Sequence, residues 1–539
     1  MMTMKGVQPM VAFPQYEATK KLRALAEDPF NLTVEGNVTP QRLTTFCAEA
    51  CGYRLLYGTE RVTESILQTL QELAAEAQAI EKMEKMQAGE VLNRIEGYAS
   101  ENRAVLHTAL RGFFADPNPS QHAKEAAELA KKELDKLQEF MEKVDREGIF
   151  TDLIMIGIGG SDLGPRANFL GLEPFAKPRR QVHFISNVDP DDAAGVLRKV
   201  PNLETCLVVV ISKSGGTLET RTNEALVKSH FLKAGLKPEK HFVSVTGKGS
   251  PMDNLQHYLR SFYLWDWVGG RYSSTSMVGG VMLSFAYGFD AFCEFLRGAS
   301  AMDKCALSRD FKHNLPLLGA LLAIWNHNFL GYPTLAIIPY CQGLHRFPAH
   351  IQQVEMESNG KRIDRHGRTV NFQTGPIIWG EPGTNAQHSF FQLLHQGTEI
   401  VPMELICFKE GQYQEDFDYQ GTTSHEKLLA NVFAQALSLA TGKEDDNPNK
   451  VFPGNRPSHL LLGRRLTPHS LGALLSYFEH KAAFQGFVWN INSFDQEGVQ
   501  LGKILAKKII DRFASRRRKE GGEPYPLGDA LLDHLHGHE

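Results

Sequence analysis

Short apolar runs recur in the middle of the chain, and each of them leads into Gly, Ser or Asp. They are DLIMI at 152–156, VHFISNV at 182–188, CLVVVIS at 206–212 and HFVSVTG at 241–247. The first run has no polar alternation, which is typical of a strand buried on both faces of a parallel sheet. We therefore predict four consecutive strands in this region.

Helical patterns flank these runs. In the stretch 124–148 apolar residues recur at helical spacing, and Gly148 stands where a helix C-cap is expected. A second helical pattern, TLETRTNEALVKSHFLKAG, fills 217–235 between two predicted strands. Strands that alternate with helices favour a parallel sheet with helices on both of its faces.

A second set of strand-like runs, TLAIIPY, GPIIWG and MELICF, follows the apolar helical stretch LPLLGALLAIWNHNFLG. The predicted fold class is therefore α/β, with two three-layer α/β/α sandwich domains and mainly parallel sheets, plus helical segments at both ends. A chain of 539 residues also exceeds the roughly 100–200 residues of one domain. We place the α/β domains at 120–300 and 301–515, a mostly helical N-terminal segment at 1–119 and a tail at 516–539, with SRRRKEGGEPYP as the start of a loose end.

Composition and charge exclude several classes of protein. Hydrophobic residues make up 42% of the chain, charged residues 22%, and the net charge of −4 gives no electrostatic basis for a nucleic-acid partner. The weakly polar stretch from Ser273 to Phe289 is interrupted by Gly and Ser and falls short of the roughly 20 apolar residues of a membrane span. We expect a buried helix there and no membrane partner. The opening MMTMKGVQPMVAFPQY has no basic and apolar signal pattern, which disfavours secretion.

The seven cysteines are scattered and form no CxxC pair. This usage is typical of reduced thiols in the cytoplasm, which is the predicted location. We expect Cys47 and Cys51 to lie one turn apart on a helix. The His-rich end HLHGHE offers imidazoles to a stray metal ion, and we assign it no function.

The stretch GIGGSDLGP at 157–165 follows the first predicted strand. A dinucleotide site needs G-x-G-x-x-G, and Asp162 replaces the third glycine of that pattern here. No G-x-x-x-x-G-K-[ST] motif occurs either, so a nucleotide P-loop is excluded. The loop suits a smaller anion, and Gly160 and Ser161 are its candidate contacts.

A related loop, SKSGGT, lies between the predicted strand at 206–212 and the next helix. Hydroxyl groups and free backbone N–H groups at a helix N-terminus form a site for a phosphate monoester. The alternative is an ordinary helix start capped by Ser or Thr. Two such loops in one α/β domain favour the phosphate site, because open parallel sheets bind ligands at the carboxyl ends of their strands. The candidate residues are Ser212, Lys213, Ser214 and Thr217.

Four further stretches carry polar residues that could act on a bound phosphate ester. Taken singly, each residue also suits a structural role, as a surface charge, a solvated carboxylate or a neighbour of a helix cap. Together they supply an arginine, a carboxylate, an imidazole placed in the first turn of a helix, and an ammonium group, without any metal-ligand spacing. The candidates are Arg271 in WVGGRYSSTS, Gln353 and Glu357 in IQQVEMESNGK, His388 in EPGTNAQHSFFQ, and Gln496 and Lys503 in FDQEGVQLGK.

These motifs resemble those of one known family. GIGGSDLGP, ISKSGGTLET, VGGRYS, QQVEMESNGK, GTNAQHSFFQ and FDQEGVQLGK are similar, in sequence and in order, to the motifs of the glucose-6-phosphate isomerases. The likeness covers about residues 90–510. Departures stand beside the functional positions, with Glu497 where many members carry Trp and Gln500 where many carry Glu. SKSGGT replaces the frequent SKTFTT, and SSTS replaces a common Leu-Trp pair, so the subfamily and fine specificity stay open.

The resemblance implies the reversible isomerisation of glucose 6-phosphate and fructose 6-phosphate through an enediolate, in glycolysis and gluconeogenesis. Glu357 resembles the family's base, which moves a proton between C1 and C2. Arg271 is the expected partner of the developing negative oxygen. His388 resembles the residue that opens the sugar ring, with Lys503 near the ring oxygen.

The resemblance also assigns the binding residues and the assembly. Ser161 with its loop and the four SKSGGT residues would hold the phosphate, and Gln353 and Gln496 would orient sugar and phosphate. The substrate is a small-molecule sugar phosphate, and neither a metal nor an organic cofactor is required. The family is typically homodimeric, which implies that His388 reaches the active site of the neighbouring subunit.

Three alternatives stay open. A non-catalytic sugar-phosphate-binding regulator would need the phosphate loops but not Glu357, Arg271 and His388 together. A nicotinamide-dependent oxidoreductase would need the dinucleotide fingerprint that Asp162 interrupts. An isomerase that also acts on mannose 6-phosphate would use the same residues.

Overall fold

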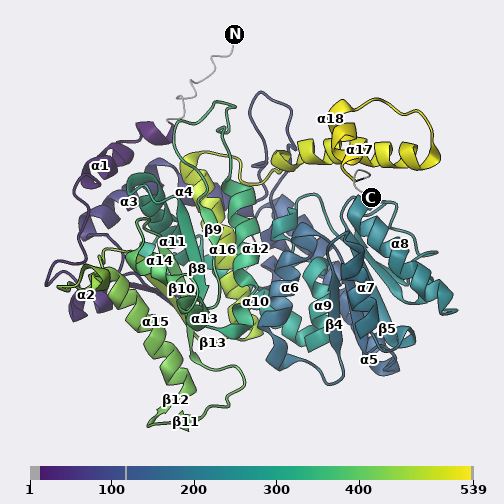
Figure 1. Cartoon of the computed structure of the whole chain (residues 1–539), viewed down its shortest axis with the longest axis horizontal. Helices are drawn as coiled ribbons and strands as arrows, with labels where there is room; N and C mark the ends of the chain where they lie inside the picture. The colour runs from purple at the N-terminus through teal and green to yellow at the C-terminus, as the bar shows by residue number, and fades with distance from the viewer. Residues whose placement is uncertain (1–11, 116–117, 536–539) are drawn as a thin grey trace. The chain divides into compact units, whose positions relative to one another are not determined.

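The computed structural model describes residues 12–115 and 118–535 of the chain. Contacts divide the chain into two compact units, Met1–Ser493 and Phe494–Glu539 (Figure 1). The first unit contains both α/β regions expected from the sequence, and the predicted domain boundaries inside it stay predictions. The opening segment 1–11 and the end of the His-rich tail, 536–539, lie outside the described residues.

The first sheet of this unit is parallel throughout, with strand order β4-β3-β5-β6-β7. The residues of β3, β5 and β6 are buried along their whole length, as expected for runs without polar alternation. All four predicted strands are confirmed, and the short edge strand β7, RSFY, was not expected because it contains no apolar run. The strands are β3 Asp152–Ile156, β4 Gln181–Ile185, β5 Cys206–Ser212, β6 Phe242–Thr246 and β7 Arg260–Tyr263.

Helices cover this sheet, and Figure 1 shows α5, α7 and α8 beside β4 and β5. The predicted helix over 124–148 is confirmed as part of α5, which ends at Gly148 in the left-handed conformation with φ of 63°. Side chains of α8 such as Val227 and Phe231 pack into the same core as Ile154 and Val208 of the sheet. The helices are α5 Gln121–Glu147, α6 Leu163–Gly171, α7 Pro190–Lys199 and α8 Leu218–Lys233.

The second sheet is mixed, with strand order β1-β2-β13-β10-β8-β9. Strands β9, β8, β10 and β13 of this sheet run parallel, and the β1–β2 hairpin adds an antiparallel edge. These sheets confirm the predicted α/β class with mainly parallel strands. The strands are β1 Cys47–Ala50, β2 Tyr53–Leu56, β8 Thr334–Pro339, β9 Ile377–Trp379, β10 Met403–Glu410 and β13 Ser458–Arg465.

The β1–β2 hairpin corrects the expectation for the first cysteines. Cys47 starts β1 and Cys51 lies in the turn, so the two residues are not one turn apart on a helix. Cys51 and Gly52 both have positive φ, 52° and 78°, which is the geometry of a tight two-residue hairpin turn. The seven cysteines form no disulfide within the described residues.

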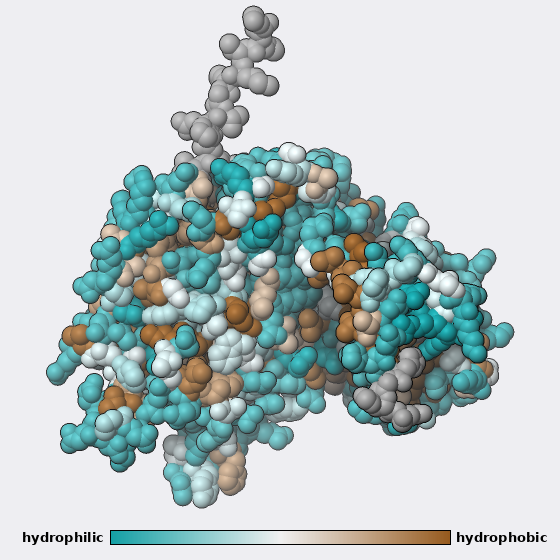
Figure 2. Space-filling view, turned by 45° about the horizontal axis from the view of Figure 1, so that its top comes forward, coloured by the Kyte–Doolittle hydropathy of each residue, from teal (hydrophilic) through white to brown (hydrophobic). Residues whose placement is uncertain are grey.

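Three helices with many buried residues pack together in the first unit. The predicted buried helix near Ser273–Phe289 is confirmed as α9, Met277–Tyr287, whose residues are all buried. It is followed by α10, Phe289–Cys305, which packs along α16, Pro468–Trp489. Over the described ranges, no helix combines the length and apolar character needed to cross a bilayer. On the face shown in Figure 2, hydrophilic residues predominate and hydrophobic ones emerge in small groups.

Outside these helices, the first unit has further helical elements. They are α1 Glu17–Leu25, α2 Pro40–Thr45, α3 Glu64–Glu76, α4 Ala79–Gln87, α11 Leu315–Ile324, α12 Phe347–Gln352, α13 Gly383–Gln387, α14 Phe391–Gln396 and α15 Ser424–Thr441.

The described part of the second unit contains the short 3-10 helix Glu497–Val499 and the helices α17 Gln500–Arg518 and α18 Pro526–Asp533. The expectation that SRRRKEGGEPYP begins a loose tail is therefore wrong, because α17 extends through the arginines. Arg512 Nε lies 2.7 Å from Asp529 Oδ1, and Arg516 Nη1 lies 2.8 Å from Asp533 Oδ1. These ion pairs join the two helices.

Candidate active site

The SKSGGT loop follows β5 and starts α8 at the carboxyl end of the first sheet. Ser212 Oγ and Thr217 Oγ1 lie 2.8 Å apart, and the Thr217 N–H donates to Ser212 Oγ at 3.4 Å. Thr217 is the N-cap residue, yet its side chain accepts no capping hydrogen bond from α8. The ordinary capped helix start is thus not what this loop forms, and the first-turn N–H groups of α8 are not satisfied by Thr217.

Lys213 and Ser214 complete this loop. Ser214 is exposed, and its hydroxyl accepts from the Gly216 N–H at 3.2 Å. The Lys213 ammonium donates to the Val268 carbonyl at 3.1 Å, just before the Gly-Gly turn that carries Arg271. Burial, together with the nearby Arg103 guanidinium, lowers the pKa of Lys213. The side chain therefore connects the loop to the segment that positions the arginine.

The first glycine-rich loop lies against the same arginine turn. A Cβ atom at Gly160 would stand 2.2 Å from the carbonyl oxygen of Gly270, so only glycine allows this approach. Ser273 Oγ also donates to the Gly160 carbonyl at 3.4 Å. Ser161 follows in the same short turn, with its N–H bonded to the Ile158 carbonyl at 3.2 Å.

Asp162, which interrupts the dinucleotide pattern, is used inside the fold. Its carboxylate accepts from Arg166 Nε at 2.9 Å, one turn further along α6. Burial raises the pKa of Asp162, while Arg166 opposes that shift. The carboxylate is therefore neutralised by its own helix.

Arg271 and Glu357 form an ion pair beside these loops. Arg271 Nη1 lies 3.6 Å from Glu357 Oε1, and the arginine side chain is 1% exposed against 21% for the glutamate. Glu357 ends the π-helical turn Gln353–Glu357 that continues α12, a local widening of the helix often found at functional sites. Within the described residues, Glu357 Oε2 is buried and has no hydrogen-bond partner.

The neighbouring carboxylate, Glu355, has a different environment. It is buried and accepts from Asn359 Nδ2 at 3.0 Å, and with the Gln485 amide oriented so that its nitrogen faces the carboxylate, that nitrogen lies 2.6 Å and 2.8 Å from the two Glu355 oxygens. Burial raises the pKa of Glu355. Of the two carboxylates in QQVEMESNGK, Glu357 is therefore the one with an oxygen left for a ligand.

Gln353 lies next to the first loop. A Cβ atom at Gly159 would be 3.5 Å from Gln353 Nε2, and Gln353 Oε1 is buried without a hydrogen-bond partner among the described residues. The structure thus brings Gln353, Gly160, Arg271 and Glu357 together.

His388 is placed differently from the prediction. It is the C-cap residue of α13, not a residue in the first turn of a helix, because that helix already begins at Gly383 directly after Pro382. Its side chain is exposed. Gln496 and Lys503 belong to the second unit, so their place in the site stays a prediction.

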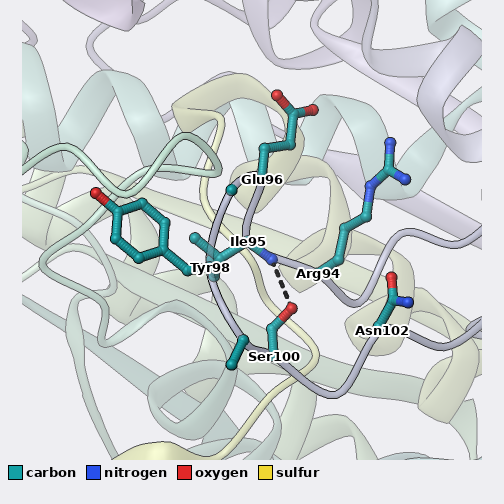
Figure 3. A pocket seen from close by; sticks show the side chains of 8 residues that line it. Arg94, Ile95, Glu96, Tyr98, Ser100 and Asn102 are labelled. Atoms are coloured by element: carbon teal, nitrogen blue, oxygen red, sulfur yellow. Dashed lines mark hydrogen bonds between the residues drawn. The ribbon is translucent and has the colours of Figure 1, made fainter.

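One open cavity of about 450 Å³ lies elsewhere, along the loop of residues 94–102 (Figure 3). Ser100 Oγ accepts from the Ile95 N–H at 3.1 Å inside this loop, and Glu96 Oε2 lies 2.8 Å from His366 Nδ1. None of the predicted site residues lines this cavity. The described residues also contain no cluster of three His, Cys, Asp or Glu side chains that could hold a metal ion.

Two residues in contact with Arg271 were not predicted. Arg271 Nε donates to Ser358 Oγ at 2.7 Å, and the Tyr272 hydroxyl lies 2.7 Å from the same oxygen. Both residues stand inside the motifs VGGRYS and MESNGK, directly after predicted site residues. Ser358 is 87 residues from Arg271 and 86 from Tyr272 in the chain, and no local sequence pattern reveals contacts over such separations.

Comparisons with known proteins give one consistent result. A glucose-6-phosphate isomerase of Protochlamydia amoebophila is 60% identical over 523 residues, covering 97% of each chain. One from Chlamydia pneumoniae is 52% identical and covers 93% of this chain and 94% of its own. The crystal structure of a glucose-6-phosphate isomerase from Chlamydia trachomatis matches with a TM-score of 0.94 at 47% identity, covering 98% of this chain and 99% of that one.

The family model for phosphoglucose isomerase matches residues 56–524. This range contains every predicted site residue. The order of the motifs, the two sheets and these similarities agree, and the chain belongs to the phosphoglucose isomerase family.

Proposed function

We propose that this chain performs the reaction of its family, the reversible isomerisation of glucose 6-phosphate and fructose 6-phosphate, with Glu357 as the base. The observation that supports this role is the ion pair of Glu357 with the buried Arg271, 3.6 Å apart and adjacent to two phosphate-type loops. Glu357 retains one oxygen without a protein partner among the described residues, so it is able to meet a substrate C–H group.

In the proposed step, Glu357 removes the proton from C2 of the open-chain aldose. The electrons of the C2–H bond form the C1–C2 double bond, and the carbonyl oxygen on C1 takes the negative charge. Arg271 stabilises that oxygen from a buried, fixed position, where a charge acts more strongly than in water. The protonated Glu357 then returns the proton to C1, and the oxygen on C2 becomes the carbonyl as its proton moves to the oxygen on C1.

The two loops at the end of the first sheet are proposed to hold the phosphate. The hydroxyls of Ser212 and Thr217 lie 2.8 Å apart at the start of α8, Ser214 stands in the same loop, and the N–H groups of the first turn of α8 favour an anion. Lys213 adds a positive charge nearby. Gly160 and Ser161 are proposed contacts on the other side, next to Arg271.

Gln353 is proposed to orient the sugar from its place beside the first loop, with Gln496 acting on sugar and phosphate. His388 is proposed to open the sugar ring with Lys503. Its exposed position at the end of α13 suits a residue that acts in the site of a neighbouring subunit, as in a homodimer. We also propose that the enzyme works in the cytoplasm.

The test is a coupled assay in which fructose 6-phosphate yields glucose 6-phosphate without a nicotinamide in the isomerising step. A Glu357→Gln variant is expected to bind a sugar phosphate but to lose the exchange of the C2 hydrogen with solvent. Glu381→Gln, which removes an exposed carboxylate, is the matched control and should keep full exchange. Full exchange in Glu357→Gln would overturn the assignment of the base.

Two of the alternatives are not favoured. A non-catalytic regulator would not require the pair formed by Arg271 and Glu357, and the chain's family consists of isomerases. A nicotinamide-dependent enzyme would need the missing third glycine, and the residue at that position, Asp162, is paired with Arg166. Additional activity on mannose 6-phosphate would be measured in the same assay with that substrate.

A further inference from the structure

The arginine of the proposed site is held by a hydroxyl that belongs to the turn carrying the base. Ser358 follows Glu357 in the chain, and its Oγ accepts from Arg271 Nε at 2.7 Å. Arg271 Nη2 donates to the Ser493 carbonyl at 2.6 Å. Ser358 and Arg271 are 0% and 2% exposed, so water does not compete for these bonds.

Tyr272 supports the hydroxyl from the other side. Its phenol oxygen lies 2.7 Å from Ser358 Oγ, and its ring stacks on His107 with a centroid distance of 4.8 Å and an interplanar angle of 17°. Burial raises the pKa of Tyr272, so the phenol keeps its proton. Burial also lowers the pKa of His107, so the stacked imidazole is neutral and does not repel Arg271.

These contacts leave Arg271 at 3.6 Å from Glu357, longer than the 2.7–2.9 Å of a direct charged hydrogen bond. An unrestrained guanidinium beside an unsatisfied carboxylate would close that gap and form a bidentate pair. The bond to Ser358 occupies Nε, which takes away one of the donors that such a pair would use.

We propose that Ser358, braced by Tyr272, is a positioning residue that keeps Arg271 from forming a direct bidentate pair with Glu357, so that both groups stay available to the substrate. This inference rests on the proposed function of Arg271 and Glu357. Ser358 itself contacts no reacting atom. Its effect belongs to the proton-transfer step and not to phosphate binding, which takes place at the loops of the first sheet.

The test compares Ser358→Ala with Ser284→Ala. Ser284 is also buried, lies in α9, and its hydroxyl has no partner among the described residues, so its removal controls for the loss of a buried oxygen. We expect Ser358→Ala to lower kcat about 10–100-fold, in line with the cost of a small misplacement of a reacting group, while KM changes by less than about 3-fold. Ser284→Ala should leave both constants within about 2-fold of the parent.

A second readout separates positioning from general loosening of the fold. A sugar-phosphate acid, whose carboxylate takes the place of the enediolate oxygens, should bind Ser358→Ala about 10-fold more weakly, which is the size expected for one misaligned charged hydrogen bond. The polyol phosphate of the same length carries no such charge and should bind both proteins equally. Equal losses for the two ligands would overturn the inference.

Tyr272→Phe keeps the aromatic ring and removes only the hydroxyl that contacts Ser358, so it tests the same point if Ser358→Ala folds poorly. We expect a fall in kcat of about 3–10-fold, whereas Tyr53→Phe, which removes another buried hydroxyl bonded at 2.9 Å to the Ser470 carbonyl, should leave kcat unchanged. If Glu357→Gln loses C2 exchange but Ser358→Ala and Tyr272→Phe behave like their controls, the positioning role fails and the proposed function stands. If Glu357→Gln keeps exchange, the proposed function itself fails.

Discussion

Two buried arginines of the first unit face carboxylates in very different ways. Asp303 accepts from Arg111 at 2.7 Å and 2.8 Å, and also from Ser476 Oγ at 2.8 Å and His480 Nε2 at 2.7 Å. Glu357, opposite Arg271, has a nearest arginine nitrogen at 3.6 Å and one buried oxygen without a partner among the described residues.

The difference separates charges that build the fold from charges kept for a substrate. Burial alone would raise the pKa of Asp303, but Arg111 and His480 hold it well below its usual range. A carboxylate in that state cannot accept a proton from a substrate near neutral pH. Glu357 lacks such a set of donors, and Arg271 donates its hydrogen bonds to Ser358 Oγ and the Ser493 carbonyl instead.

The largest effect is expected for Glu357→Gln. Loss of the base should lower kcat by about 10²–10⁴-fold, the usual contribution of a general base. The free energy of unfolding should change by less than about 1 kcal/mol, because Arg271 keeps its own hydrogen bonds. Steady-state kinetics and urea unfolding of the same preparation check both values, and a strongly destabilised variant would place Glu357 among the structural charges.

Asp303→Asn should behave in the opposite way. Removing one partner of a buried ion pair costs about 3–5 kcal/mol, because Arg111 is then left without its main counter-charge. The kcat per folded molecule should stay close to that of the parent protein. Urea unfolding followed by circular dichroism measures the loss, and a stable variant with low kcat would break the comparison.

His388→Ala tests the exposed residue of the proposed site. If the imidazole opens the sugar ring, the variant should lose about 10²-fold in rate on closed-ring substrate and much less on open-chain substrate. The free energy of unfolding should not change, since His388 is exposed. Equal losses on the two substrate forms would remove the ring-opening role.

Ser212→Ala tests the phosphate loops. Loss of one hydroxyl that bonds to a charged ligand should raise KM for the sugar phosphate about 10-fold and leave kcat nearly unchanged. Thr222→Ala is the control, because this exposed hydroxyl of α8 bonds only to its own helix, at the Leu218 carbonyl. A fall in kcat without a change in KM would show that Ser212 acts in the chemical step and not in phosphate binding.

Much of the fold could be predicted from the sequence because its strands are continuous apolar runs. The strands that were missed lack this signal: β7 has four residues beginning with arginine, and β13 has three leucines between polar residues. The β1–β2 hairpin was also missed, although Cys51-Gly52 at its turn could have indicated it. Helix ends depend on local backbone geometry, which is why His388 was assigned to the wrong end of α13.

The site was predicted only as a set of separate motifs. Local patterns identify a loop that suits a phosphate, but they do not show which distant side chains touch. The bond between Arg271 and Ser358 spans 87 residues, and the pairing that distinguishes Glu357 from Glu355 depends on Gln485, far along the chain. Such contacts arise from tertiary packing and need the structure.

A third buried cluster gives an effect of a different kind, a change in the slope of stability with pH. His459 Nδ1 lies 2.7 Å from Glu60 Oε1, and its Nε2 lies 3.4 Å from Glu404 Oε1. Burial lowers the pKa of His459, but Glu404 and Glu60 outweigh it and raise the value to about 9. Because the folded pKa exceeds the unfolded value near 6.5, this contribution to stability is complete below about pH 6.5 and is lost as the pH rises through about 9.

His459→Gln should therefore abolish the decline in the free energy of unfolding between about pH 6.5 and 9, whatever its effect on absolute stability. The variant and the parent are compared by how steeply the free energy of unfolding changes with pH. Its absolute value is not used, since the variant also leaves Glu60 and Glu404 with one partner fewer. Urea unfolding at a series of pH values measures that slope, and kcat per folded molecule should follow the parent profile throughout. If His459→Gln instead shifted the pH dependence of kcat, the charges of the second sheet would be coupled to Glu357, and the division between structural and reactive charges would not hold.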